Sequence, residues 1–244
     1  MIEVKNLTKY FGDICAVNDI SFTIENCSVV GFLGPNGAGK STTIRLMTGV
    51  LRPDSGTSKI CGQNITTNGL QAQSSFGYLP EAAAGFGNLT VREFLTYCGE
   101  CRAIWGEPLT LAIEETTKLI ELQPALDQEI RKLSKGWRQR AWLAQAILHD
   151  PPVLLLDEPT DGLDPNQKDK INDLIRQKKV DKTIILSTHI LEEVEEICDQ
   201  VLLIANGRIV ANDTPENLVQ EFGSLSKAFK TLTRKTPVPS GHKT

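Results

Sequence analysis

A glycine-rich segment, GPNGAGKST, occupies residues 34–42 and has the residue types needed to hold a chain of phosphates. Its glycines let the backbone turn tightly and aim N–H groups at phosphate oxygens, and the helical pattern that follows has an amino end that favours an anion. Lys40 can reach the β- and γ-phosphates, and the Ser41 hydroxyl can ligate Mg²⁺. The G-x-x-x-x-G-K-S spacing therefore predicts a nucleoside triphosphate site. Its predicted binding residues are Gly34, Pro35, Asn36, Gly37, Ala38, Gly39, Lys40, Ser41 and Thr42.

An acidic pair, Asp157 and Glu158, directly follows the apolar run at residues 153–156. Such a run is typical of a parallel strand buried on both faces. Asp157 can hold Mg²⁺, usually through water, and Glu158 can orient and deprotonate an attacking water. A turn or helix-capping carboxylate would explain Asp157, but not two adjacent carboxylates at the end of a buried strand.

His189 follows another apolar segment, residues 183–186, after a Ser-Thr pair. A histidine taken alone is more often structural, but this position favours a contact to the γ-phosphate. Open α/β sheets bind ligands at the carboxyl ends of their strands, so we expect the phosphate loop, the acidic pair and His189 to lie together. The predicted catalytic residues are Lys40, Glu158 and His189.

The elements that must position these residues follow from hydrophobic periodicity. Two β-type segments are expected near residues 2–5 and 20–25, before the strand that leads into the phosphate loop. From about residue 88 to residue 150 the periodicity is helical, which indicates an insertion into an otherwise α/β body. Asn206 and Gly207 separate two apolar runs and predict a β-hairpin.

Composition excludes several classes of protein. The chain has 244 residues, 40% of them hydrophobic, and a net charge of −4, which argues against a general nucleic-acid binder. Residues 1–4 lack the start of a signal peptide, and no apolar run exceeds five residues, so we expect a cytoplasmic protein without a membrane-spanning helix.

Residues 223–244 carry five Lys or Arg side chains and no carboxylate side chain. A flexible, solvated basic tail is expected there, with a membrane-surface or partner contact as the alternative.

Two further segments make the chain resemble the ATP-binding subunits of ABC transporters. Residues 133–140, LSKGWRQR, resemble the signature sequence of that family, and residues 154–165, LLLDEPTDGLDP, resemble its Walker B motif and D-loop. The resemblance covers residues 2–222. It implies an α/β fold, namely a P-loop NTPase core of mainly parallel sheet flanked by helices. An N-terminal antiparallel β subdomain and an inserted helical subdomain at about 88–150 complete an ATPase domain of residues 1–222.

The resemblance also assigns roles to individual residues. His189 matches the switch histidine, and Phe11 matches the aromatic that stacks on adenine, with Tyr10 as a second candidate. Ser134 and Gly136 match the signature residues that close over the γ-phosphate of a second copy. The implied metal-binding residues are Ser41, Asp157 and Glu81, the last standing where the family usually has a glutamine.

Three residues depart from the family pattern. Lys135 replaces a glycine-like position of the signature, Trp137 replaces its usual glutamine, and Glu81 replaces the glutamine already mentioned. Glutamate at residue 81 together with LSKG resembles the bacterial exporter branch, which includes drug, polysaccharide and gliding-motility systems.

The resemblance implies that MgATP is bound and hydrolysed between two ATPase subunits packed head to tail, as a homodimer or heterodimer. The subunits would drive transmembrane permease subunits from the inner face of the cell membrane, with no nucleic acid involved. Two alternatives remain open: a non-transport ATPase of this family, and an ATP-dependent dimerisation switch without hydrolysis. The acidic body and single ATPase domain argue against the first, and intact Lys40, Asp157, Glu158 and His189 argue against the second.

Overall fold

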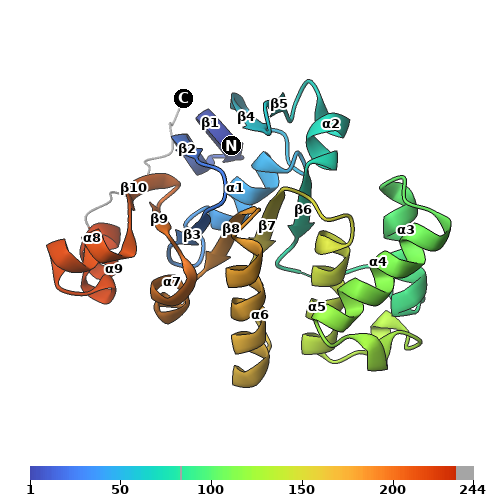
Figure 1. Ribbon diagram of the computed structural model, residues 1–244. Helices are drawn as coiled ribbons and strands as arrows, with labels where there is room; N and C mark the ends of the chain where they lie inside the picture. The colour runs from blue at the N-terminus through green and yellow to red at the C-terminus, as the bar shows by residue number, and fades with distance from the viewer. Residues whose placement is uncertain (83, 235–244) are drawn as a thin grey trace.

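The computed structural model describes residues 1–82 and 84–234 and contains a central, mainly parallel β-sheet (Figure 1). Its strand order is β10-β9-β3-β8-β7-β6, and only the β9–β10 pair is antiparallel. The strands are β3 (Val29–Leu33), β6 (Phe76–Leu79), β7 (Val153–Asp157), β8 (Thr183–Thr188), β9 (Gln200–Ala205) and β10 (Arg208–Asp213). The expected α/β sheet is confirmed, and β9 and β10 form the hairpin predicted around Asn206 and Gly207.

A second, antiparallel sheet has the order β2-β1-β4-β5. It consists of β1 (Ile2–Phe11), β2 (Ile14–Ile24), β4 (Ser55–Ile60) and β5 (Gln63–Asn64). The first two strands are longer than the segments expected at residues 2–5 and 20–25, because they continue to a hairpin tip where Phe11 pairs with Ile14. Both of these side chains are exposed, so the tip lacks the buried periodicity on which the prediction depended.

Helices flank the parallel sheet and also form a separate group at one end of the molecule (Figure 1). The α-helices are α1 (Lys40–Met47), α2 (Gly69–Ser74), α3 (Val91–Cys101), α4 (Gly106–Leu119), α5 (Lys135–Ile147), α6 (Pro165–Lys178), α7 (Leu191–Ile197), α8 (Pro215–Phe222) and α9 (Leu225–Arg234). Between β6 and β7 the described chain forms α3 to α5 and two short 3-10 helices, Gln123–Ala125 and Ile130–Lys132. This stretch corresponds to the helical insertion expected at about 88–150. No helix in the described ranges is long and apolar enough to cross a membrane.

The parallel sheet separates two hydrophobic cores. Val30 and Phe32 of β3 pack in the core beneath the antiparallel sheet, where Phe32 meets Phe22 edge to face with ring centroids 5.6 Å apart. Val29 and Leu33 of the same strand pack in the core that extends under the helices. Each face of β3 is therefore buried, which explains why its sequence is a continuous apolar run.

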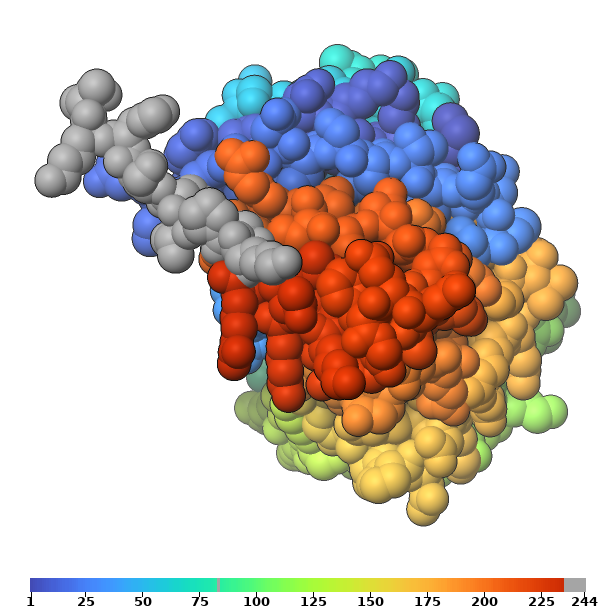
Figure 2. Space-filling model, turned by 90° about the vertical axis from the view of Figure 1, so that its left-hand side faces the viewer, coloured from blue at the N-terminus to red at the C-terminus, as the bar shows by residue number. Residues whose placement is uncertain are grey.

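The C-terminal region differs from the flexible tail expected from residue 223. Residues 225–234 form α9, and its apolar side chains recur at the i, i+3, i+4 and i+7 spacing of an amphipathic helix. Leu225 and Ala228 are buried, and Phe229 and Leu232 pack against the same core. Figure 2 shows this layer, in red, against the orange segments of the neighbouring strands. The rest of the predicted tail, residues 235–244, lies outside the described residues.

Candidate active site

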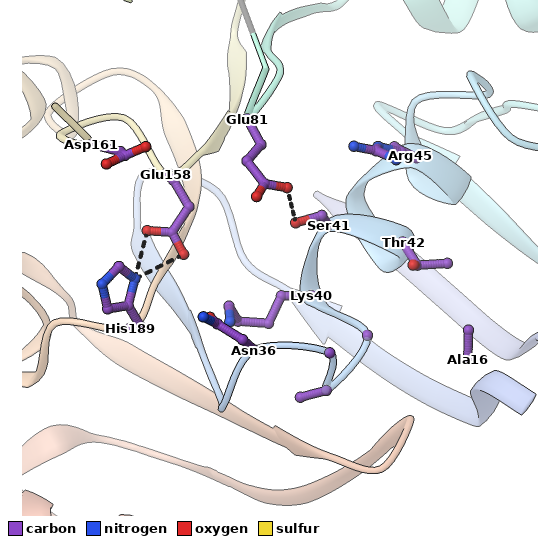
Figure 3. A pocket seen from close by; sticks show the side chains of 13 residues that line it. Ala16, Asn36, Lys40, Ser41, Thr42, Arg45, Glu81, Glu158, Asp161 and His189 are labelled. Atoms are coloured by element: carbon purple, nitrogen blue, oxygen red, sulfur yellow. Dashed lines mark hydrogen bonds and ion pairs between the residues drawn. The ribbon is translucent and has the colours of Figure 1, made fainter. Parts of the chain in front are cut away.

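A cavity of about 500 Å³ lies where the phosphate loop meets the carboxyl ends of β7 and β8. Residues 36–42, Glu81, Glu158, Asp161 and His189 contribute to its wall. Figure 3 shows Glu158 and His189 on one side of the cavity, with Ser41 and Glu81 across from them. The structure thus brings together the three groups that sequence analysis placed after separate strands.

The phosphate loop is held against two neighbouring strands. Gly39 has a φ of +110°, and a Cβ on it would lie 2.5 Å from the carbonyl oxygen of Ala16 in β2, so only glycine fits there. The amide of Gly207, beyond β9, donates a hydrogen bond of 2.9 Å to the carbonyl of Ala38. No side chain caps the amino end of α1, and its first N–H groups are therefore available to an anionic ligand.

The Lys40 ammonium is buried within the phosphate loop. Its Nζ donates to the carbonyl oxygens of Gly34, at 2.7 Å, and Pro35, at 3.3 Å. Burial lowers the pKa of Lys40, and the carboxylates of Glu158, Asp157 and Glu81 partly offset this effect. A triphosphate in the cavity would add further negative charge beside this buried cation and so favour its charged form. Gly34 and Pro35, which do not line the cavity, thus act by holding the lysine.

The predicted metal-binding side chains surround one hydroxyl group. Ser41 Oγ lies 3.0 Å from Oδ1 of Asp157 and 3.2 Å from Oε2 of Glu81. Asp157 is fully buried, its Oδ1 also accepts from Ser187, and its Oδ2 has no hydrogen-bond partner. Burial raises the pKa of Asp157 above its usual value. An unpaired buried carboxylate oxygen beside a serine hydroxyl fits the oxygen ligands that Mg²⁺ prefers.

Glu158 and His189 form a pair at the mouth of the cavity. His189 Nδ1 lies 3.0 Å from Oε2 and 3.2 Å from Oε1 of Glu158. The Glu158 side chain is only 12% exposed, against 54% for His189. Burial raises the pKa of Glu158, with a smaller opposing effect from His189. A carboxylate with a raised pKa next to a triphosphate site is suited to general-base catalysis.

The predicted signature residues and the predicted adenine-stacking residue lie outside this cavity. Ser134 is exposed and caps α5, where its Oγ accepts from the amide of Trp137 at 3.4 Å. Gly136 is buried against the segment that leads into α6. Phe11 and Tyr10 are 49% and 47% exposed at the tip of the β1–β2 hairpin. One chain therefore does not bring Ser134 or Gly136 to its own phosphate loop.

Comparison with known proteins decides the family. Residues 17–161 match the family model described as "ABC transporter". The chain belongs to the ABC transporter family. This ABC ATPase is 35% identical over 220 residues to a protein named Nod factor export ATP-binding protein I from Burkholderia lata, and the match covers 90% of this chain and 72% of that protein. It is accordingly an ATP-binding and ATP-hydrolysing subunit.

Solved structures agree with this assignment. The chain resembles the structure titled "Structure of ATP binding subunit of ABC transporter" with a TM-score of 0.88 and 29% identity, covering 96% of this chain and 99% of that one. It also resembles "Dimeric Structure of MJ0796, a Bacterial ABC Transporter Cassette" with a TM-score of 0.81 and 25% identity, covering 88% and 98%.

Three residues that support the site of this ABC ATPase escaped sequence analysis. Glu193 in α7 is buried, and its carboxylate accepts from Thr160 at 2.7 Å and from Thr188 at 2.8 Å. It thereby links the loop after Glu158 to the strand end before His189. Gln139 of α5 donates to the carbonyl of Glu158 at 3.0 Å, and Ser187 Oγ accepts from the amide of Glu158 at 3.0 Å. The one sequence signal that could have predicted a supporting role for Gln139 is its place in the signature segment.

Replacing Asp157 by asparagine is expected to raise the free energy of unfolding of the nucleotide-free protein by about 1 kcal/mol at pH 7. Because the folded protein raises the pKa of Asp157, the ionised carboxylate destabilises the fold above that pKa. The stability advantage of D157N over the native protein should accordingly shrink as the pH falls toward the raised pKa of Asp157, because the native carboxyl then becomes neutral as well. Urea unfolding at pH 7 and pH 5 measures the effect.

Asp150→Asn is the matched control, because the folded protein shifts the pKa of Asp150 in the opposite direction. The Lys182 ammonium lies 2.8 Å from Oδ1 of Asp150 and holds the pKa of that carboxyl below its usual value. Asp150 therefore contributes stability at pH 7 that is lost as the pH falls through its lowered pKa, so D150N should not stabilise the protein. A D157N protein less stable than the native one at pH 7 would contradict the account of Asp157.

Proposed function

We propose that this ABC ATPase binds MgATP between two head-to-tail copies and uses its hydrolysis to drive export through separate permease subunits. One observation carries the proposal: the cavity of a single chain holds the phosphate loop, Glu158 and His189, but neither Ser134 nor Gly136. The exposed Ser134 lies at the amino end of α5, and a helix end of this kind favours an anion, but Ser134 does not line the cavity of its own chain. A second copy, packed head to tail, would close the cavity with this helix end.

Each residue of the site then has a role in binding. The backbone of residues 36–42 would cradle the phosphates, and Lys40 would exchange its carbonyl partners, Gly34 and Pro35, for phosphate oxygens. Ser41, Asp157 and Glu81 would hold Mg²⁺, directly or through water. When bound, this ion would offset the charge of the β- and γ-phosphates. Phe11, exposed on the hairpin tip, would stack on adenine.

Hydrolysis depends on the pair at the cavity mouth. Glu158 would accept a proton from the attacking water, and His189 would orient this carboxylate and contact the γ-phosphate. The partner subunit's Ser134 would contact the γ-phosphate from the opposite side. Loss of the γ-phosphate would remove the charge that holds the two copies together, and the dimer would open.

Two observations support export as the direction. The relative from Burkholderia lata is named an export ATP-binding protein. The chain also combines Glu81 with the LSKG form of the signature, the pattern that resembles the exporter branch.

In this proposal residues 1–222 are the ATPase domain. The helical subdomain at about 88–150 would pass the motion to permease subunits at the inner face of the cell membrane, without nucleic acid.

Phosphate release tests the proposal directly. The purified chain should hydrolyse ATP slowly and only with Mg²⁺, and the rate should rise when it is co-purified with a multi-span permease encoded beside it. Stimulation by RNA or ribosomes instead would favour the non-transport alternative. ATP-dependent dimerisation without phosphate release would favour a dimerisation switch, and either result would contradict the proposed function.

A further inference from the structure

Lys135 of the signature segment is paired with the D-loop of its own chain. Its Nζ lies 2.6 Å from Oδ2 of Asp161. Its aliphatic stem covers Gly162, where a Cβ would lie only 2.5–2.8 Å from Cγ, Cδ and Cε of Lys135. Gly162 has a φ of +76°, a backbone conformation that favours glycine. The lysine stem thus lies along Gly162 while its ammonium group pairs with Asp161.

The two partners belong to different parts of the proposed ATP dimer. Asp161 lines the ATP cavity together with Glu158 and His189 (Figure 3). The amide of Asp161 donates to the Glu158 carbonyl at 3.1 Å. Lys135 is the first residue of α5, next to Ser134, at the helix end that would face the second ATP. The ion pair therefore connects the cavity of one ATP with the helix end that closes over the other.

Binding of ATP changes the charges around both partners. A triphosphate in the cavity places several negative charges near Asp161, which repel its carboxylate and attract the lysine ammonium. A triphosphate on the second copy offers the lysine a more highly charged partner than one carboxylate. The higher charge of phosphate therefore favours movement of the ammonium group from Asp161 to phosphate.

We propose that Lys135 exchanges Asp161 for the γ-phosphate bound by the second copy when the ATP dimer closes. This inference rests on the head-to-tail dimer of the proposed function and assigns a new phosphate contact to it. The ion pair then restrains closure until ATP is present, and the freed lysine stabilises the closed ATP dimer.

A static surface ion pair is the alternative, and it makes different predictions. The side chains of Lys135 and Asp161 are 65% and 45% exposed. Pairs this exposed contribute little to stability, so removing either partner would then change dimerisation hardly at all. In the exchange proposal, the two substitutions have effects of opposite sign.

The experiment measures dimerisation by sedimentation at saturating MgATP, in a Glu158→Gln background that prevents turnover. We expect K135Q to raise the dimer dissociation constant about tenfold, because a charged phosphate contact is lost. D161N should lower it about threefold, because the competing carboxylate is gone. In a protein that already carries K135Q, adding D161N should leave the dimer dissociation constant unchanged. With MgADP in place of MgATP, K135Q should not change dimerisation.

Lys132→Gln serves as the control for a general loss of positive charge. Lys132 lies directly before the signature segment, is 64% exposed and pairs with Glu129 at 2.8 Å, so K132Q should leave dimerisation unchanged. A K135Q protein that behaves like K132Q, or a D161N protein that dimerises more weakly than its parent, would overturn the exchange. Failure of the E158Q parent itself to dimerise with MgATP would instead contradict the proposed function, and the inference would fall with it.

Discussion

Replacement of Glu158 by glutamine is expected to lower ATP turnover about 10³-fold and to leave an ATP-bound dimer that does not open. The glutamine amide has nearly the size of the carboxylate but cannot accept the proton of the attacking water. The backbone at residue 158 is held independently of this side chain, by Ser187 and Gln139, so its position should be retained. Phosphate release and sedimentation with MgATP measure the two effects.

The pH dependence of the native enzyme provides a second check on Glu158. Burial raises the pKa of this carboxyl, and the base must be ionised, so turnover should fall with decreasing pH at a value above the usual carboxylate range. Glu195→Gln, an exposed position on α7, is the control and should retain turnover. Normal hydrolysis by E158Q would remove Glu158 from the role of base.

Replacement of Lys40 by alanine is expected to weaken ATP binding by about 100-fold or more. The ammonium group is buried and already paired with backbone carbonyls, so in the native protein it reaches the phosphates without being drawn out of water. Alanine offers no charge, and Asp157, Glu158 and Glu81 would then face the triphosphate with no lysine to counter them. Titration calorimetry with MgATP measures the loss.

Lys59→Ala is a suitable control, because this half-buried lysine lies on β4, away from the cavity, and pairs only weakly, at 3.6 Å, with Glu3. It should bind ATP like the native protein. MgATP should also raise the melting temperature of the native and K59A proteins but not that of K40A. Unchanged ATP affinity in K40A would overturn the assignment of the phosphate loop.

The parts of the site that depend on local pattern were predictable. The phosphate loop, the acidic pair and His189 each follow an apolar run, and parallel strands bring such ends to one edge of a sheet. The cavity at that edge confirms the expectation. Buried strands were recognisable for the same reason, since a strand covered on both faces must be apolar throughout.

Other parts depend on contacts between distant residues and left little trace in the sequence. Glu193 is one of four glutamates in the LEEVEEI segment, and only the packing of α7 places this one beside Thr160 and Thr188. The Lys135–Asp161 pair joins residues 26 positions apart. The α9 helix could have been found from its i, i+3, i+4, i+7 apolar pattern, which its many basic residues obscured.

The head-to-tail arrangement is tested most directly by the structure of the E158Q protein with MgATP. The account predicts two copies, with each triphosphate in contact with Lys40 of one chain and with the partner subunit's Ser134 across the interface. A single copy that encloses ATP on its own, or a pair of copies in which the partner's Ser134 lies far from every triphosphate, would contradict it.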